Sequence, residues 1–160
     1  MKTRAIRSLA LASVLLVGLT ITMVVAQGMS EGPPDYREWT RLNPQPNSIA
    51  SAHPTVKDVF VNDAGADAAL SRSFPFPEGS EFIKASLGED LSVFVVTAMR
   101  KVAGFDPDNG DWEYGMFERG SDGAFEGMWA EVGSDMHMMC VSCHTGAADN
   151  DFVFLSYTGD

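Results

Sequence analysis

The chain has 160 residues, a formal net charge of −11 at pH 7 and a hydrophobic fraction of 45%. The acidic balance argues against nucleic acid and anionic lipid as partners. Cys140 and Cys143 are the only cysteines, so a network of structural disulfides is excluded as well.

The N-terminus carries a predicted export signal. Three basic residues within the first seven positions precede an apolar run over residues 9–26, and small residues stand before the bond Ala26–Gln27. We therefore expect residues 1–26 to be a cleaved signal peptide. Residues 27–160 then form a single exported domain of net charge −14, because the leader removes three positive charges. An uncleaved membrane anchor remains the alternative, since about 18 apolar residues approach the length that spans a bilayer.

The first part of the mature chain predicts a small helix, a strand and a second helix. Residues 35–42 favour a short helix with Asp35 as its cap, and residues 55–62 alternate as a strand does. An Asn-Asp-Ala-Gly turn is expected at 62–65, followed by a short helix over 66–73.

The middle of the chain predicts the main strands. A turn at Glu78–Gly79 leads into a strand that carries Phe82 and Lys84. Residues 91–101 form the clearest strand, because they are rich in β-branched side chains. The Asp-Pro and Asn-Gly pairs within residues 104–119 indicate a hairpin loop that leads into another strand.

The C-terminal part predicts one helix and a last strand. Residues 121–129 are rich in glycine and fit no single element, a helix is predicted over 131–143, and an apolar strand over 151–157. This order predicts an α+β fold, in which a predominantly antiparallel β-sheet carries a few flanking helices.

The sequence Cys-Val-Ser-Cys-His near the C-terminus is the most specific motif. Two thiols three positions apart can add to the vinyl groups of a haem, and the histidine that follows can ligate the iron. Cys140 and Cys143 are therefore the predicted attachment sites of a haem c, with His144 as the iron ligand. The alternatives are a redox dithiol and a partial zinc site, for which only His53 and His137 remain besides carboxylates.

The position of the motif predicts an open iron site. Electron-transfer cytochromes c carry it near the N-terminus and supply a methionine ligand from far downstream, whereas only sixteen residues follow His144 and none is methionine. Met136, Met138 and Met139 lie too close to the motif to reach the opposite side of the haem, so we expect them to pack beside it. An open or water-bound sixth position indicates ligand binding or catalysis.

From residue 35 to 157 the chain resembles the cytochrome P460 family, through the stretches VKDVFVN, FPEGSEFIK, GFDPDNGDWEYGMF and CVSCHTGAADNDFVFLSY in that order. The resemblance implies a mainly antiparallel sheet with helices, a homodimer, a periplasmic location and one c-type haem that oxidises hydroxylamine to nitrous oxide or nitric oxide. It also implies a lysine joined covalently to the porphyrin, and Lys84 falls at that position. A buried lysine that loses its proton is a competent nucleophile.

Some members of the family place a carboxylate over the iron, opposite the histidine ligand. The corresponding position here falls near Val96 or Thr97, and neither residue is acidic. The expected proton acceptor is therefore Thr97 acting through water, or a carboxylate from another segment such as Glu78 or Glu81.

A related branch, the cytochrome c-prime-beta proteins, implies a different function. These proteins share the fold, lack the lysine bond and bind nitric oxide in an apolar pocket. Nitric oxide binding without turnover is therefore the alternative to hydroxylamine oxidation, and an electron-transfer cytochrome is a third. Five phenylalanines are candidates to line such a pocket: Phe60, Phe74, Phe76, Phe82 and Phe94.

The remaining basic residues receive simpler interpretations. His53 precedes a proline and is expected to be a loop residue, and His137 is expected to face solvent or a haem propionate. Arg100 and Lys101 are candidate propionate partners, or else a solvated strand end. The acidic surface predicts either a basic redox partner protein or solubility alone.

Overall fold

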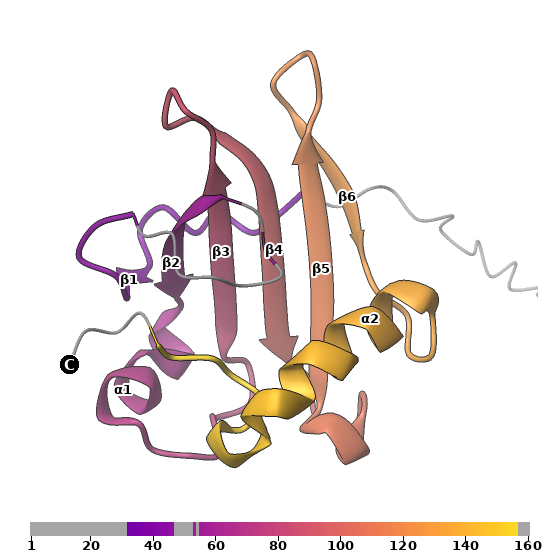
Figure 1. The fold of residues 1–160 in the computed structure, drawn as a ribbon. Helices are drawn as coiled ribbons and strands as arrows, with labels where there is room; N and C mark the ends of the chain where they lie inside the picture. The colour runs from indigo at the N-terminus through magenta and orange to yellow at the C-terminus, as the bar shows by residue number, and fades with distance from the viewer. Residues whose placement is uncertain (1–31, 47–52, 54, 157–160) are drawn as a thin grey trace, which may run out of the picture.

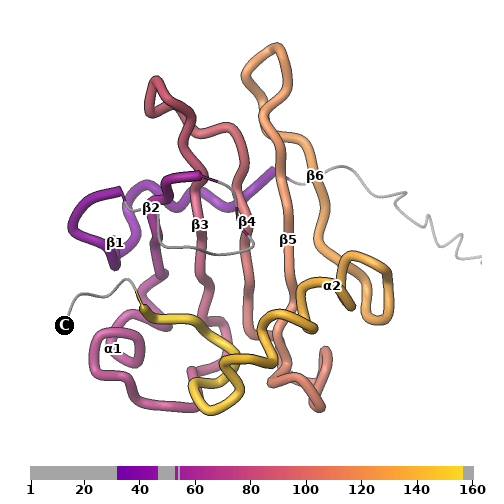
Figure 2. Tube along the Cα trace, viewed as in Figure 1, coloured from indigo at the N-terminus to yellow at the C-terminus, as the bar shows by residue number. Residues whose placement is uncertain are grey.

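The computed structural model describes residues 32–46, 53 and 55–156, which form one antiparallel sheet with helices on it (Figure 1). The strands lie in the sheet in the order in which they occur along the chain, and Figure 2 shows the same meander as a trace. Their bounds are β1 Thr40–Arg41, β2 Val56–Val61, β3 Glu81–Leu87, β4 Val93–Lys101, β5 Trp112–Arg119 and β6 Phe125–Trp129. The predicted α+β class with an antiparallel sheet is confirmed.

Two α-helices connect to the sheet, and both begin at a polar cap. Helix α1, Asp63–Ser71, follows Asn62, whose Oδ1 accepts hydrogen bonds from the N–H of Gly65 at 3.2 Å and of Glu81 at 3.0 Å. Helix α2, Asp135–His144, follows Ser134, whose Oγ accepts the His137 N–H at 3.2 Å. The 3-10 turns η1, Pro107–Asn109, and η2, Thr145–Asn150, complete the helical elements of the described chain.

The sheet buries a hydrophobic core on each side, because alternate residues of a strand point to opposite faces. The helical face is the side covered by α1, α2 and the C-terminal segment, and its core includes Phe82, Met99, Trp112, Tyr114, Val141 and Val153. The opposite face buries Ile83, Ala85, Val96 and Phe117 beneath Tyr36 and Trp39 of the N-terminal segment. Figure 1 shows α2 crossing the helical face in front of β5.

Most predicted elements agree with the structure. The strands expected at 55–62, around Lys84, at 91–101 and after the 104–111 loop are β2, β3, β4 and β5. The helices expected at 66–73 and 131–143 are α1 and α2, although α1 begins earlier and α2 begins later than predicted. The ambiguous glycine-rich stretch contains strand β6.

Three local predictions are wrong. Residues 35–42 form a turn followed by β1 instead of a helix, because Tyr36 and Leu42 are buried separately, on opposite faces of the sheet. The expected turn at 62–65 is the first turn of α1, since Asn62 caps it. Residues 151–156 belong to no strand.

Asp151 explains why the apolar C-terminal segment does not join the sheet. Its carboxylate accepts the Phe76 N–H at 2.8 Å and lies 2.5 Å from Lys101 Nζ, while its carbonyl accepts the Trp112 indole N–H at 2.8 Å. These contacts fasten the segment to the edge of the core through side chains, so Val153 is buried without a strand partner in the described chain.

The predicted signal peptide, residues 1–26, lies outside the described residues. Within the residues that the structure describes, no helix has both the length and the apolar character needed to cross a membrane.

Candidate functional site

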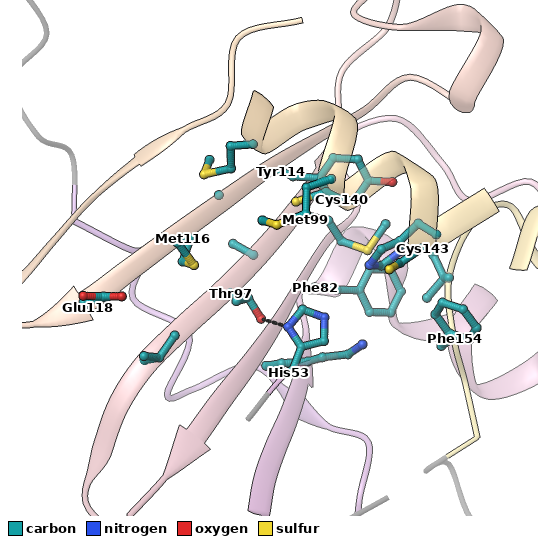
Figure 3. A pocket seen from close by; sticks show the side chains of 18 residues that line it. His53, Phe82, Thr97, Met99, Tyr114, Met116, Glu118, Cys140, Cys143 and Phe154 are labelled. Atoms are coloured by element: carbon teal, nitrogen blue, oxygen red, sulfur yellow. Dashed lines mark hydrogen bonds between the residues drawn. The ribbon is translucent and has the colours of Figure 1, made fainter. Parts of the chain in front are cut away.

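A cavity opens between α2 and the helical face of the sheet (Figure 3). Its empty volume is about 1100 Å³, which includes space open to solvent at its mouth. Strands β3, β4 and β5 form its floor, α2 forms one wall, and Phe154 of the C-terminal segment closes another side. The lining is mainly apolar with a few polar groups, which is the usual character of a cofactor site.

The register of the sheet sets which polar side chains enter the cavity. Lys84 on β3 pairs with Thr97 on β4, and Thr97 pairs with Met116 on β5. Residues that pair directly point to the same face, with Cβ atoms about 4.5–5.5 Å apart. These three residues therefore form one row across the cavity floor, and Val95 and Glu118 pair in the next row.

Helix α2 brings the motif residues to the same cavity. Residues three and four positions apart lie on one side of an α-helix, so Cys143 and His144 share a side with Cys140. All three line the cavity. Cys140 is partly buried against the core of the helical face, Cys143 is exposed, and the two thiols are not joined to each other. Both sulfurs are thus available to a group that fills the cavity.

His144 is held as a neutral imidazole. Its Nδ1 lies 2.7 Å from the Phe152 carbonyl oxygen, which can only accept, so Nδ1 carries the proton and Nε2 the lone pair. Burial lowers the pKa of His144 to about 4, although the hydrogen bond to Phe152 opposes that shift. The ring lies 5.0 Å from the Tyr114 ring and 5.6 Å from the Phe154 ring. An imidazole fixed through Nδ1 in this way is the form in which histidine binds a metal.

The loop before β5 packs against Phe152, the residue whose carbonyl fixes His144. Gly110 in this loop has a φ of +73°, and a Cβ there would lie 2.7 Å from the Phe152 ring. A side chain would therefore be strained by the left-handed backbone and would also push Phe152 away. Glycine at this position allows the close approach that puts the Phe152 carbonyl against His144.

Lys84 is a basic side chain in a mostly apolar setting. Burial, with a smaller contribution from the positive charge of Lys57, lowers the pKa of Lys84 to about 8. Its Nζ lies 5.9 Å from the centre of the Phe154 ring. A lysine with a depressed pKa has a larger neutral fraction near neutral pH, and the neutral amine is the nucleophilic form.

His53 is a cavity residue that the sequence did not identify. Its Nδ1 forms a hydrogen bond of 3.2 Å with Thr97 Oγ1, and its ring centre lies 6.4 Å from that of His144. Burial lowers the pKa of His53 to about 3, and the nearby charges of Lys84, His144 and Lys57 act in the same direction. No local pattern marks a histidine before a proline as a site residue, so only the folded chain reveals this contact.

Among the described residues of the cavity lining, Glu118 supplies the carboxylate. Among the sequence-based candidates, Glu78 is an exposed turn residue, and neither it nor Glu81 contributes to the lining. Val96 points to the opposite face and is buried there, whereas Thr97 faces the cavity. The sequence feature that could have identified Glu118 is the alternation along β5, which puts Tyr114, Met116 and Glu118 on one face of the sheet.

Of the five phenylalanines proposed as a pocket lining, Phe82 alone lines the cavity. Phe74 and Phe76 pack with the core of the helical face, and Phe60 packs on the opposite side. Phe154, which the sequence placed in a strand, lines the cavity instead.

The other basic candidates also lie elsewhere than expected. His137 is buried rather than solvent-exposed, with its Nε2 3.1 Å from Asp106 Oδ2. Arg100 pairs with Glu113 and stacks 4.0 Å over the Trp129 ring, and the Lys101 ammonium pairs with Asp151. These side chains do not line the cavity, and they hold the surrounding structure together.

The residues present fit a haem attached through α2. Two thiols and a neutral imidazole face one mostly apolar cavity, and the buried hydroxyl of Tyr114, a residue of the same lining, has no hydrogen-bond partner in the described part of the chain. A buried donor without a partner is costly unless a bound group or water completes it. The described residues hold no group of three or more His, Cys, Asp or Glu side chains that could bind a metal ion together, as a zinc site would require.

Comparison with known proteins identifies the family. The family model described as Cytochrome P460 matches residues 33–155, which is most of the chain, and no curated protein matches it. The matched range contains all six strands, both helices and every described residue of the cavity lining. The chain therefore belongs to the cytochrome P460 family, whose name implies a haem with its iron as the cofactor.

Proposed function

We propose that this protein is a periplasmic mono-haem c-type cytochrome that oxidises hydroxylamine in the cavity between α2 and the sheet. One observation carries the proposal. A single cavity is lined by Cys140, Cys143, His144 and Lys84, the four residues that resemblance to the family assigns to a lysine-linked haem c.

The thiols and the imidazole would hold the haem. Cys140 and Cys143 would each add across a vinyl group, and His144 would ligate the iron through Nε2. The hydrogen bond from His144 Nδ1 to Phe152 fixes the ring orientation and raises the basicity of the ligating nitrogen.

Lys84 would form the third covalent bond. Its nitrogen would replace a hydrogen on the porphyrin rim, so that a C–N bond forms and one N–H and one C–H bond break. The two hydrogens are lost as two protons and two electrons, and an external two-electron oxidant would accept the electrons. The apolar surroundings that lower the pKa of Lys84 favour the neutral amine that this step needs.

When bound, the haem supplies an iron centre that takes electrons from the nitrogen of hydroxylamine. The protein must remove the protons that are released at the same time. Glu118 offers a carboxylate on the cavity lining, and the Thr97 hydroxyl would relay protons through water. Thr97 lies two positions along β4 from Val95, the cross-strand partner of Glu118. General-base assistance of this kind typically contributes about 10²–10⁴-fold to a rate.

The cellular setting belongs to the same proposal. Residues 1–26 would direct export and be removed near Ala26, and the mature chain would form a homodimer in the periplasm. Its net charge of −14 would attract a basic redox partner that accepts the electrons.

Intact mass and absorption spectra of the mature protein test the proposal. A mass equal to the chain from Gln27 plus haem, minus two hydrogens, would support two thioethers and a lysine bond. Hydroxylamine should then reduce the haem and be consumed with an external acceptor. A haem-loaded protein that neither shows this mass nor consumes hydroxylamine would contradict the proposal.

The apolar lining favours a second candidate function, binding of nitric oxide without turnover. Met116, Met136 and Met139 contribute to this lining, and such walls suit a small uncharged gas better than a hydrogen-bonding substrate. Tight nitric oxide binding by a protein that leaves hydroxylamine unchanged would select this function.

A further inference from the structure

His53 and His144 face the same cavity from different sides. His144 comes from α2, and His53 precedes β2 and contacts the sheet at Thr97. Their ring centres are 6.4 Å apart, with an angle of 73° between the ring planes. Figure 3 shows the second ring nitrogen of His53 on the side away from Thr97, toward Cys143 and Phe154 in that view.

The separation of the rings matches two imidazoles on one metal. A metal–imidazole bond is about 2 Å long and a ring nitrogen lies about 1 Å from its ring centre, so two ligands on one ion have centres about 6 Å apart. A histidine that only hydrogen-bonds to a small metal-bound molecule would stand about 9 Å away, because a hydrogen bond and a second ligand bond intervene. The distance between His53 and His144 fits the first arrangement.

Both rings are also oriented in the way that metal ligands are. A metal-binding histidine nearly always has its other nitrogen in a hydrogen bond, which fixes the tautomer and the ring plane. His144 Nδ1 donates to the Phe152 carbonyl, and His53 Nδ1 contacts the Thr97 hydroxyl. Donation from His53 Nδ1 to the Thr97 oxygen places the lone pair of His53 on Nε2.

We propose that His53 Nε2 is the second axial ligand of the haem iron in the resting protein, opposite His144, with Thr97 as the residue that orients it. This inference rests on the haem of the proposed function and not on the choice of substrate. A small nitrogen ligand must then displace the His53 imidazole before it can bind.

The test is the spin state of the ferric haem in the purified, haem-loaded protein. Wild type should show six-coordinate, low-spin absorption and electron paramagnetic resonance spectra at neutral pH, and His53→Ala should become high-spin. Added imidazole should restore the low-spin spectrum of His53→Ala, with an affinity at least about tenfold higher than for wild type, because no internal ligand competes. Met116→Leu, which alters the same cavity and keeps both histidines and Thr97, should stay low-spin.

Thr97→Val provides an independent measurement if His53→Ala loads haem poorly. Loss of the hydroxyl should give a mixture of high-spin and low-spin haem, because His53 loses its orienting contact. A high-spin wild type, or a His53→Ala protein that stays low-spin, would overturn the assignment of His53. These outcomes are separate from the fate of the proposed function, since a high-spin wild type that oxidises hydroxylamine would remove the His53 ligand and leave the activity standing.

Discussion

Lys84 and Thr97 are direct partners across β3 and β4, and both side chains point into the cavity that the motif residues of α2 line. The pairing fixes the amine and the hydroxyl on adjacent strands of a rigid sheet. Groups held on sheet strands keep their positions better than groups on loops. The predicted cross-linking residue and the predicted proton relay would therefore act on one bound group, and a substitution at either position should be visible in the haem spectrum.

Lys84→Arg should abolish the third covalent bond. Arginine keeps the positive charge but has no neutral amine to attack the porphyrin near neutral pH. The mass of the haem-loaded protein should rise by two hydrogens beyond the change due to the substitution, and the Soret band should move toward that of an ordinary haem c. Lys101→Arg, which preserves the pair with Asp151 outside the cavity, should leave both properties unchanged. An unaltered spectrum in Lys84→Arg would contradict the role of Lys84.

Cys140→Ala and Cys143→Ala should each leave the haem held by one thioether fewer. Both thiols line the cavity, and each is expected to add to one vinyl group, so the remaining thiol should form a single thioether. In a Lys84→Arg background, replacing both cysteines should make the haem extractable by acidified acetone. Ser142→Ala, on the same helix with its hydroxyl bonded to the Met139 carbonyl at 2.8 Å, is the matched control and should retain the haem. Covalent haem in the triple variant would refute attachment through these thiols.

Glu118→Gln should slow hydroxylamine oxidation by about 10²–10⁴-fold if its carboxylate accepts the substrate protons. The absorption spectrum and the haem content should not change, because the side chain is similar in size. Glu126→Gln is the control, since Glu126 pairs with Glu118 on the same sheet face and does not line the cavity. Equal rates in the two variants would mean that Glu118 is not the proton acceptor.

Asp151→Asn should destabilise the fold by about 3 kcal/mol, because it leaves the Lys101 ammonium largely buried without its counter-charge. Asparagine is nearly the same size and tolerates the positive φ of 53° at this position, so the loss would reflect charge rather than shape. Urea unfolding of the haem-loaded protein measures the change. Asp149→Asn, at an exposed position nearby, should change stability by no more than about 0.5 kcal/mol.

Several structural features could be predicted from the sequence because they depend on local patterns. Alternation and β-branching indicated β2 to β5, and the order of short strands indicated an antiparallel sheet. Local patterns also failed where tertiary contacts compete with them. Residues 151–157 are apolar as a buried strand is, but Asp151 bonds to Phe76 and Lys101 and holds the described part of this segment off the sheet.

The sequence by itself determined the chemistry of the site, because the Cys-x-x-Cys-His spacing places two thiols and an imidazole on one side of a helix whatever surrounds it. It also indicated Lys84 through resemblance to the family. Only the tertiary structure decided that Glu118, His53 and Phe154 meet these residues at the cavity. Such contacts join segments far apart in the chain, and strand register and loop path, rather than any local pattern, determine which of them form.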